Sequence, residues 1–202
     1  MLILHTHGTE AFAECAADNY RSRDPSLSVL ALGETAEEVL NGAGIPTLRL
    51  TALFDDPDFN MAYYNAAVAI RETLGQHPSI SYILDIHRDS MVFSDGTVYA
   101  PVTQIGDTPT AQLMFVVGTD EAGADHGGWR DNLSLALRLQ RRLTEQYPTL
   151  MRDVNLRSAS FNEQYAKGAL LVEAGSTGCT LDEAKAAVKL LSEALVREIR
   201  GE

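Results

Sequence analysis

The chain has 202 residues, of which 45% are hydrophobic and 22% charged, proportions typical of an ordinary globular protein with a full core. Its net charge is −12, and its 16 Lys and Arg residues form no basic tract, which argues against nucleic acid and anionic membrane surfaces as partners. No stretch reaches the ~20 apolar residues that span a bilayer, and no charged-then-apolar signal opens the chain. Cys15 and Cys179 allow either one bridge or two free thiols, so the redox compartment stays open.

The first half of the chain alternates apolar runs with helical periodicity. Leu2-Ile3-Leu4 is a short apolar run of the kind that forms a buried strand. Ser26 or Ser28 can cap a helix, which Asn41-Gly42 then ends. We therefore expect strands at residues 2–4, 45–50 and 82–86, helices at residues 29–40 and 60–75, and a loop at residues 11–23.

The second half continues this alternation. Ser94-Asp95-Gly96-Thr97 is typical of a hairpin turn and predicts paired strands at residues 91–93 and 98–100. Thr180 with Glu183 three residues later is a capping box, which predicts the start of the last helix. The remaining expected elements are strands at residues 113–118 and 169–173, a helix at residues 132–146, and a short strand within residues 153–161.

These elements predict a single α/β domain over residues 1–202. The chain contains no repeat, low-complexity tract or Pro/Ser-rich linker that would mark a domain boundary. Alternating strands and helices are typical of three layers, in which a mostly parallel twisted sheet carries helices on both faces.

Imidazole and carboxylate side chains are concentrated where the first and third expected strands end. His7 and Glu10 follow the first strand, and His87 follows the third. Parallel strands present ligand-binding groups at their carboxyl ends, and the spacing His7-x-x-Glu10 lets one turn of backbone aim two donors at one point. A catalytic zinc ion takes three protein ligands of these types. We therefore predict a zinc site formed by His7, Glu10 and His87, with His5 as a competing ligand.

A carboxylate, Glu173, closes the buried strand expected at residues 169–173. Packing does not explain a charge there, because such a carboxylate must be solvated, paired or functional. A zinc hydrolase needs a carboxylate that is not a ligand to take a proton from water, and Glu173 is our candidate for this base. Asp85 shares the strand face of His87, so it either orients that imidazole or is solvated at the rim.

Substrate-binding candidates are polar side chains near these strand ends. Arg88 can anchor a substrate carboxylate, although a structural ion pair with a neighbouring acid explains it equally well. Asn162, together with Asn60 and Tyr63, suits a polar glycopeptide and would suit a plain peptide almost as well.

One rival motif predicts different chemistry. The run Ala174-Gly175-Ser176-Thr177-Gly178 approximates the nucleophile elbow of α/β-hydrolases, with Ala in place of the first Gly. Those enzymes place the triad histidine after the serine, whereas no histidine follows His126 in this chain. The serine-hydrolase interpretation is therefore poor, and phosphate-binding glycine signatures are absent as well.

Short motifs occur in order along nearly the whole chain: His-Thr-His-x-Thr-Glu, Asp-Ile-His-Arg-Asp-Ser, Phe-Val-Val-Gly, Trp-x-x-Asn-Leu, Phe-Asn and Leu-Leu-Val-Glu-Ala-Gly. Together they resemble the catalytic domain of the stage II sporulation protein P family, zinc N-acetylmuramoyl-L-alanine amidases of endospore formers. Carried over by motif, His7 and His87 become zinc ligands and Glu173 the catalytic base. The resemblance points to Glu10 as the middle ligand, with Glu14 and Glu34 as alternatives, because in the wider superfamily that Glu lies well downstream of the first His.

The resemblance also implies a location and partners. We expect a peptidoglycan hydrolase on the cell-wall side of the membrane, anchored in the full-length protein through a region outside these 202 residues. It would act in engulfment beside stage II sporulation protein D, a glycan-cleaving enzyme. The expected reaction is zinc-dependent hydrolysis of the amide between N-acetylmuramic acid and the L-alanine of the stem peptide. The alternatives are a zinc carboxypeptidase or endopeptidase acting on cell-wall peptides, and a wall-binding module whose metal is only structural.

Overall fold

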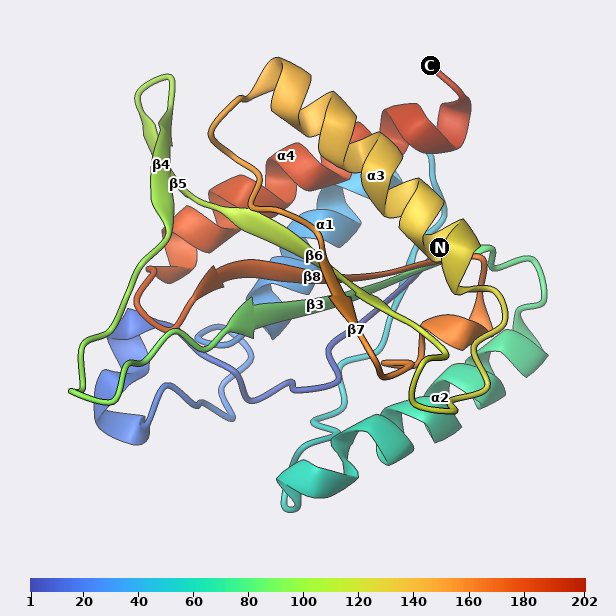
Figure 1. The fold of residues 1–202 in the computed structure, drawn as a ribbon, viewed down its shortest axis with the longest axis horizontal. Coiled ribbons are helices and arrows are strands. Elements are labelled where there is room, and N and C mark those ends of the chain that lie inside the picture. Colours follow the sequence, from blue (N-terminus) through green and yellow to red (C-terminus); the bar gives the residue numbers. More distant parts are fainter.

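One sheet of six strands runs through the middle of the molecule (Figure 1). The computed structural model describes all residues, 1–202. The strands are β1 (Leu2–Leu4), β2 (Leu48–Arg49), β3 (Tyr82–Asp89), β6 (Leu113–Gly118), β7 (Asn155–Arg157) and β8 (Gly168–Ser176). Their order is β2-β1-β3-β8-β6-β7. The first four in this order are mutually parallel, β6 is antiparallel to β8, and β7 is parallel to β6.

Helices cover both faces of the sheet, as predicted. Successive strand residues point to opposite faces, so Ile3 belongs to the larger hydrophobic core and Leu2 to the smaller one on the other side. No helix has the length and apolar character needed to cross a membrane. The helices over the larger core are α1 (Leu30–Gly42), α3 (Trp129–Gln146) and α4 (Leu181–Arg200), and the helix over the smaller core is α2 (Ala62–Gln76) (Figure 1).

The same alternation sets polar side chains on the α2 face of the sheet. Ile83 of β3 belongs to the core under α2, and Asp85 and His87 follow it at the two-residue spacing of one strand face. On the neighbouring strand β8, Glu173 is the register partner of His87. Because β1, β3 and β8 are parallel, their carboxyl ends meet at one edge, and these groups are held there side by side.

Most predicted elements are confirmed, with ends that differ by a few residues. β3 continues to Asp89, and α3 begins at Trp129 rather than at residue 132. The capping box is present: Thr180 Oγ1 accepts a hydrogen bond from the Glu183 backbone N–H at 3.2 Å, and Glu183 Oε2 accepts one from the Thr180 N–H at 2.8 Å. The strand expected at residues 45–50 is shorter than predicted, since β2 lies at the edge of the sheet and pairs on one side only.

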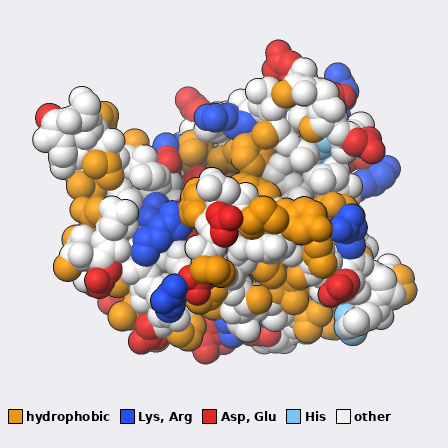
Figure 2. Space-filling model, turned by 90° about the horizontal axis from the view of Figure 1, so that it is seen from below, with side chains coloured by type: hydrophobic (Ala, Val, Ile, Leu, Met, Phe, Trp, Pro, Cys, Tyr) orange, Lys and Arg blue, Asp and Glu red, His pale blue; other side chains and the backbone are white.

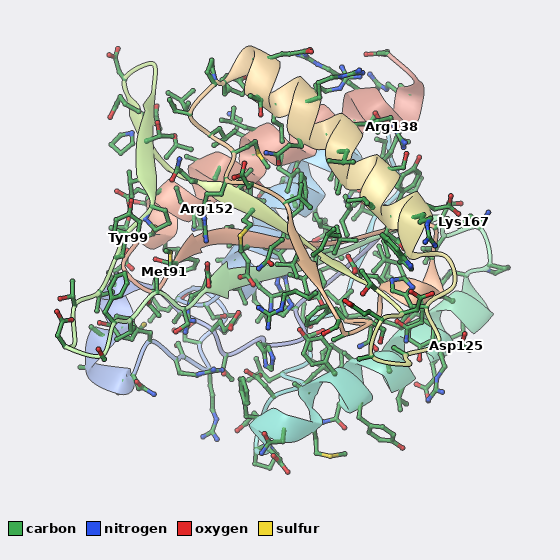
Figure 3. The ribbon with its side chains drawn as sticks, viewed as in Figure 1. Met91, Tyr99, Asp125, Arg138, Arg152 and Lys167 are labelled. Carbon is green, nitrogen blue, oxygen red and sulfur yellow. The ribbon has the colours of Figure 1, made fainter.

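The hairpin predicted at residues 91–100 is present, but it is too short to form regular strands. Val92 and Val98 form an antiparallel bridge, and the backbone N–H groups of Phe93 and Tyr99 donate to the carbonyls of Thr97 at 2.8 Å and Met91 at 2.9 Å. The side chains there are mostly exposed, so no packing holds them in a sheet. The segment instead folds over the end of β8, where the carbonyl of Tyr99 (labelled in Figure 3) accepts a hydrogen bond from Ser176 Oγ at 2.5 Å.

A second, longer hairpin, which was not predicted, lies farther along the chain. β4 (Val102–Ile105) and β5 (Thr108–Ala111) pair antiparallel and make a separate two-stranded sheet. Their connection contains Gly106, whose φ of 59° is a conformation that glycine adopts at little cost. The β4–β5 hairpin projects from the molecule near α4 (Figure 1), so it does not contribute to the polar edge of the main sheet.

Candidate active site

The predicted zinc ligands lie together at the carboxyl edge of the sheet. His7 and Glu10 follow β1 in one turn, which is closed by a hydrogen bond from the Glu10 backbone N–H to the His7 carbonyl at 3.0 Å. His87 of β3 lies with Nδ1 3.5 Å from Glu10 Oε2, and its ring centre is 5.6 Å from that of His7. All three side chains are buried. The fold therefore brings the two motifs, which are far apart in the sequence, to one point.

These donors fit a zinc ion in type, and one pair of them fits in spacing. Zinc–nitrogen and zinc–oxygen bonds of about 2.0–2.2 Å in a tetrahedral site keep two ligand atoms roughly 3.3 Å apart, which is close to the 3.5 Å between His87 and Glu10. His7 Nδ1 is buried without a hydrogen-bond partner, and a buried polar atom of this kind requires an explanation. No three His, Cys, Asp or Glu side chains converge closely enough to form a ready-made metal site. Zinc binding by His7, Glu10 and His87 therefore stays a prediction.

A carboxylate lies behind each imidazole. Asp85 Oδ1 is 3.0 Å from His87 Nε2, in an ion-pair contact that is not aligned as a hydrogen bond. Thr6 holds Asp85 in place through its backbone N–H at 2.9 Å and its hydroxyl at 2.5 Å. Asp55 Oδ2 lies 4.0 Å from His7 Nδ1. A carboxylate as close as Asp85 can fix the orientation of a ligating imidazole, as the sequence indicated. Asp55, which the sequence did not indicate, is too far from His7 to form a hydrogen bond and adds only negative charge beside it.

The charges around His87 strongly favour its protonated form. Burial lowers the pKa of His87, but the carboxylates of Asp85 and Glu10 outweigh burial and hold that pKa well above its ordinary value. His87 thus lies between two carboxylates, and as a zinc ligand it would have to give up this proton, so zinc binding would compete with protonation.

Glu173 has the environment of a proton-transfer group. Its Oε2 is buried without a hydrogen-bond partner, while the residue as a whole is partly exposed. Burial raises the pKa of Glu173 to about 8; the charge of His87 opposes this rise, and those of Glu10 and Asp89 add to it. A carboxyl group whose pKa lies near neutrality can accept and return a proton within one catalytic cycle.

His5, the competing ligand, points away from this edge. Its Nδ1 contacts the carbonyl of Ile86 at 2.9 Å, and its ring lies against α1. The approach is so close that a Cβ atom on Gly33 would fall 2.3 Å from His5 Nε2, so glycine is required there. Burial lowers the pKa of His5 to about 4. The structure therefore gives His5 a packing role beneath α1.

The alternative acids for the middle ligand also lie elsewhere. Glu14 Oε1 accepts a hydrogen bond from the Leu181 backbone N–H at 3.0 Å, at the first residue of α4. Glu34 is exposed on α1. Among these acids, Glu10 is the one that contacts His87, so the geometry favours it as the middle ligand.

The two predicted substrate-binding residues are both buried. Arg88 donates hydrogen bonds to the carbonyls of Ala11 at 2.9 Å and Tyr20 at 3.0 Å, and thereby fastens the segment that contains the short 3-10 helix Ala13–Asp18. Asn162 donates to the carbonyl of Tyr63 at 2.9 Å. These contacts give both side chains a structural role, and their binding of substrate remains a prediction.

Two aromatic rings form a wall of the site, of which sequence reasoning named Tyr63 as a substrate-binding candidate and missed Phe59. The ring of Phe59 stacks on His7 with centres 4.2 Å apart, and Tyr63 presents its edge to His7 at 5.4 Å. Burial raises the pKa of the Tyr63 hydroxyl well above its ordinary value. The spacing of these aromatics, four residues at the start of a helix, could have placed both on one face.

Comparisons with known proteins agree with the motif order. The model of the family described as Stage II sporulation protein P matches residues 1–196. The chain is 26% identical over 211 residues to Stage II sporulation protein P of Bacillus subtilis (strain 168), covering 96% of this chain and 50% of that protein. The chain thus spans about half the length of this curated relative.

The fold is also found among solved structures. The crystal structure of N-acetylmuramoyl-L-alanine amidase from Clostridium difficile 630 superimposes with a TM-score of 0.58 at 15% identity, covering 99% of this chain and 94% of that one. At this identity the likeness establishes a shared fold. The family match over nearly the whole chain establishes more: the protein belongs to the stage II sporulation protein P family.

Proposed function

We propose that this protein is a zinc-dependent amidase that hydrolyses the bond between N-acetylmuramic acid and the L-alanine of the peptidoglycan stem peptide during sporulation. The observation that carries the proposal is the meeting of His7, Glu10 and His87 beside Glu173 at one sheet edge. Family membership supports a role in sporulation, and the solved structure that shares the fold bears the name of this amidase activity.

In this proposal each side chain has a separate task. Zinc held by His7, Glu10 and His87 would supply Lewis acidity and a water molecule of lowered pKa. Glu173 takes the proton from water and returns it to the nitrogen of the leaving alanine. Asp85 holds the His87 ring through its contact with Nε2. The burial of these groups limits access of bulk water and strengthens their electrostatic effects.

The test of the base is the isosteric variant Glu173→Gln. We expect this variant to keep its fold and bound zinc but to lose about 10²–10⁴-fold in turnover, because it removes a general acid/base without changing the ligands. Turnover is measured as release of peptide from purified peptidoglycan, and zinc by elemental analysis. If the variant loses zinc together with activity, Glu173 is a ligand and the assignment of Glu10 is wrong.

The bond that is cleaved is identified from the products of the same digest. Mass spectrometry should find intact stem peptides with a free N-terminal alanine, released from unbroken glycan strands. Shortened stems that are still attached to muramic acid would instead identify a carboxypeptidase or endopeptidase. Binding to peptidoglycan without any product, in zinc-loaded protein, would identify a wall-binding module.

The setting of the reaction is part of the same proposal. We place the protein on the cell-wall side of the membrane, where it meets peptidoglycan and acts beside stage II sporulation protein D. Family membership supports this location. Co-purification of the two proteins from sporulating cells, and protease accessibility of the chain in intact protoplasts, would test the partner and the location separately.

A further inference from the structure

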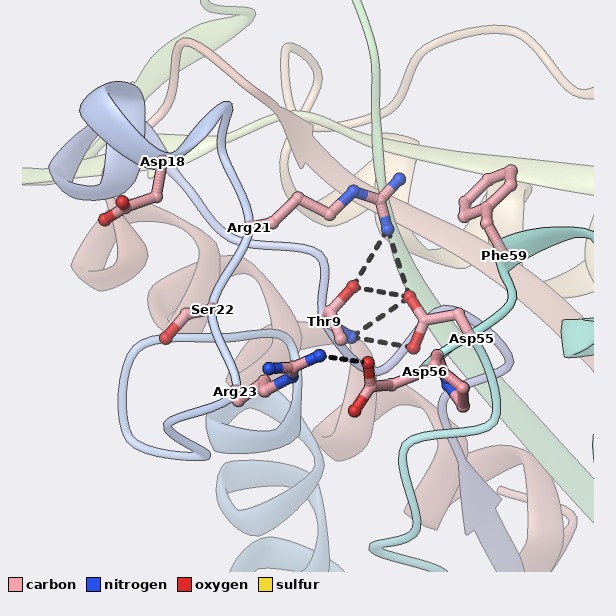
Figure 4. Close-up of a pocket in the computed structure, with 9 residues that line it drawn as sticks. Thr9, Asp18, Arg21, Ser22, Arg23, Asp55, Asp56 and Phe59 are labelled. Atoms are coloured by element: carbon pink, nitrogen blue, oxygen red, sulfur yellow. Dashed lines mark hydrogen bonds and ion pairs between the residues drawn. The ribbon is translucent and has the colours of Figure 1, made fainter.

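Beside His7 the surface opens into a cleft of about 600 Å³ (Figure 4). Its walls come from Thr9, from residues 18–23 and from residues 55–59, and they are mostly polar. The cleft shares walls with the candidate active site, because Phe59 stacks on His7 and Asp55 Oδ2 lies 4.0 Å from His7 Nδ1. A ligand held in the cleft therefore lies next to the predicted zinc position.

Arg21 is fixed in the wall of this cleft. The side chain of Asp55 is fully buried and accepts hydrogen bonds from the Thr9 hydroxyl at 2.6 Å and from Arg21 Nη1 at 3.0 Å (Figure 4). The guanidinium of Arg21 also lies over the ring of Phe59, 4.6 Å from its centre. Only Nη1 of Arg21 is engaged, whereas a guanidinium carries five N–H donors. Arg21 therefore offers unused donors in a fixed position.

Arg23 adds a second guanidinium to the same cleft. Its side chain is 74% exposed, and its Nη2 contacts Asp56 Oδ1 at 2.5 Å while its other donors are free. Asp18, Asp55 and Asp56 also line the cleft, so its carboxylates outnumber its two arginines. Figure 2, which views the molecule from the α2 side, shows Lys and Arg side chains as separate spots rather than as one continuous patch. Arg21 and Arg23 therefore offer hydrogen-bond donors that their aspartate partners leave free, rather than a net positive charge.

We propose that this cleft binds a free carboxylate on the peptide part of the substrate, with Arg21 and Arg23 as its hydrogen-bond donors. The inference rests on the proposed function, which places the stem peptide on one side of the cleaved bond. Planar guanidinium groups match the two oxygens of a carboxylate, and they bind it more specifically than a lysine does.

The test measures peptide binding in the Glu173→Gln background, where turnover is removed. The probes are a synthetic stem tripeptide with a free α-carboxylate on its second residue and the same peptide amidated at that carboxylate. By isothermal titration calorimetry, Arg23→Gln should weaken binding of the acidic peptide about three- to fivefold, as an exposed ion pair of up to about 1 kcal/mol implies. It should leave binding of the amidated peptide unchanged.

The matched control is Arg141→Gln on α3, since Arg141 is also 74% exposed and paired with an acid, Glu145. Arg141→Gln should bind both peptides as the background protein does. Any of three results would overturn the inference. Arg23→Gln could bind the acidic peptide as tightly as the background protein does, it could weaken binding of both peptides equally, or the background protein could fail to bind the acidic peptide at millimolar concentration. Since binding is measured without catalysis, these results are independent of which bond the active protein cleaves.

Discussion

At the residue scale, Glu163 is a buried carboxyl group that the proposed chemistry does not use. Its Oε2 accepts a hydrogen bond from the Gly118 backbone N–H at 2.6 Å, and its Oε1 has no partner. Burial raises the pKa of Glu163 to about 8, and its backbone hydrogen bonds offset this only in part. His126 Nε2 lies 4.0 Å away, but burial lowers the pKa of His126 as well. Both groups are therefore neutral in the folded protein near pH 7.

This raised pKa predicts that stability falls as the pH rises. Between the ordinary value of 4.5 and about 8, Glu163 is ionised in the unfolded chain but keeps its proton in the folded one. The free energy of unfolding therefore decreases across this window by at most about 1.4 kcal/mol per pH unit from this group alone. Glu163→Gln keeps an acceptor for Gly118 and removes the titration, so it should lose less stability than wild type between pH 5 and pH 8.

Urea denaturation at several pH values measures this difference. The control is Glu145→Gln, because Glu145 is 72% exposed on α3 and its replacement leaves buried groups unchanged. Glu145→Gln should follow the wild-type pH dependence. Parallel curves for Glu163→Gln and wild type would show that Glu163 is already ionised in the folded protein.

At the element scale, the site depends on the parallel run β1, β3 and β8 and on the helices that hold it in place. α4 lies over the larger core, and its N-terminus carries the Thr180–Glu183 capping box. Glu14, from the loop after β1, accepts a hydrogen bond from the next N–H of the same helix end. This hydrogen bond joins the segment after β1, which lies beside the site, to the helix that covers the larger core.

Thr180→Ala should destabilise the protein by about 1 kcal/mol, because it removes the side-chain acceptor that caps α4. Thr180→Ser keeps the hydroxyl and should cost much less. Free energies of unfolding from urea titrations at one pH compare the two variants. Equal losses for Ala and Ser would assign the effect to the lost methyl group rather than to the cap.

At the scale of the whole molecule, zinc would couple the separate strand ends into one unit. Its predicted ligands come from the loop after β1 and from β3, so an ion that binds the folded chain would stabilise the whole domain. At a free zinc concentration of 100 times the dissociation constant, the gain is about 2.7 kcal/mol. For a domain of this size that is a rise in melting temperature of roughly 5–10 °C.

Thermal denaturation with and without zinc checks this linkage. Wild type should melt higher with zinc and contain close to one zinc per chain, whereas His87→Ala should show neither effect. His77→Ala, at an exposed position after α2, is the matched histidine control and should behave as wild type. A wild-type protein that stays metal-free after zinc loading would rule out the zinc proposal and leave the fold assignment intact.

Much of the fold was predictable because its signals are local. Neighbouring residues alone set three kinds of signal: the apolar runs of β1, β3, β6 and β8, the helical periodicity, and the Thr180 capping box. All three are confirmed. The hairpin at residues 91–100 forms only one bridge, because a turn signal at residues 94–97 does not show whether its flanks have a sheet to join. The antiparallel direction of β6 was likewise not predicted, since an apolar run has the same composition in either direction.

For the candidate site, the sequence by itself determined which donors could meet, because His7 and Glu10 follow one apolar run and His87 and Glu173 close two others; that they bind zinc stays a prediction. Only the tertiary structure decided which groups surround them. It placed His5 under α1, buried Arg88 and Asn162 in backbone contacts, and brought Asp55 and Phe59 against His7. The physical reason is that a strand end fixes where a side chain begins, whereas its partners come from loops whose paths depend on long-range packing.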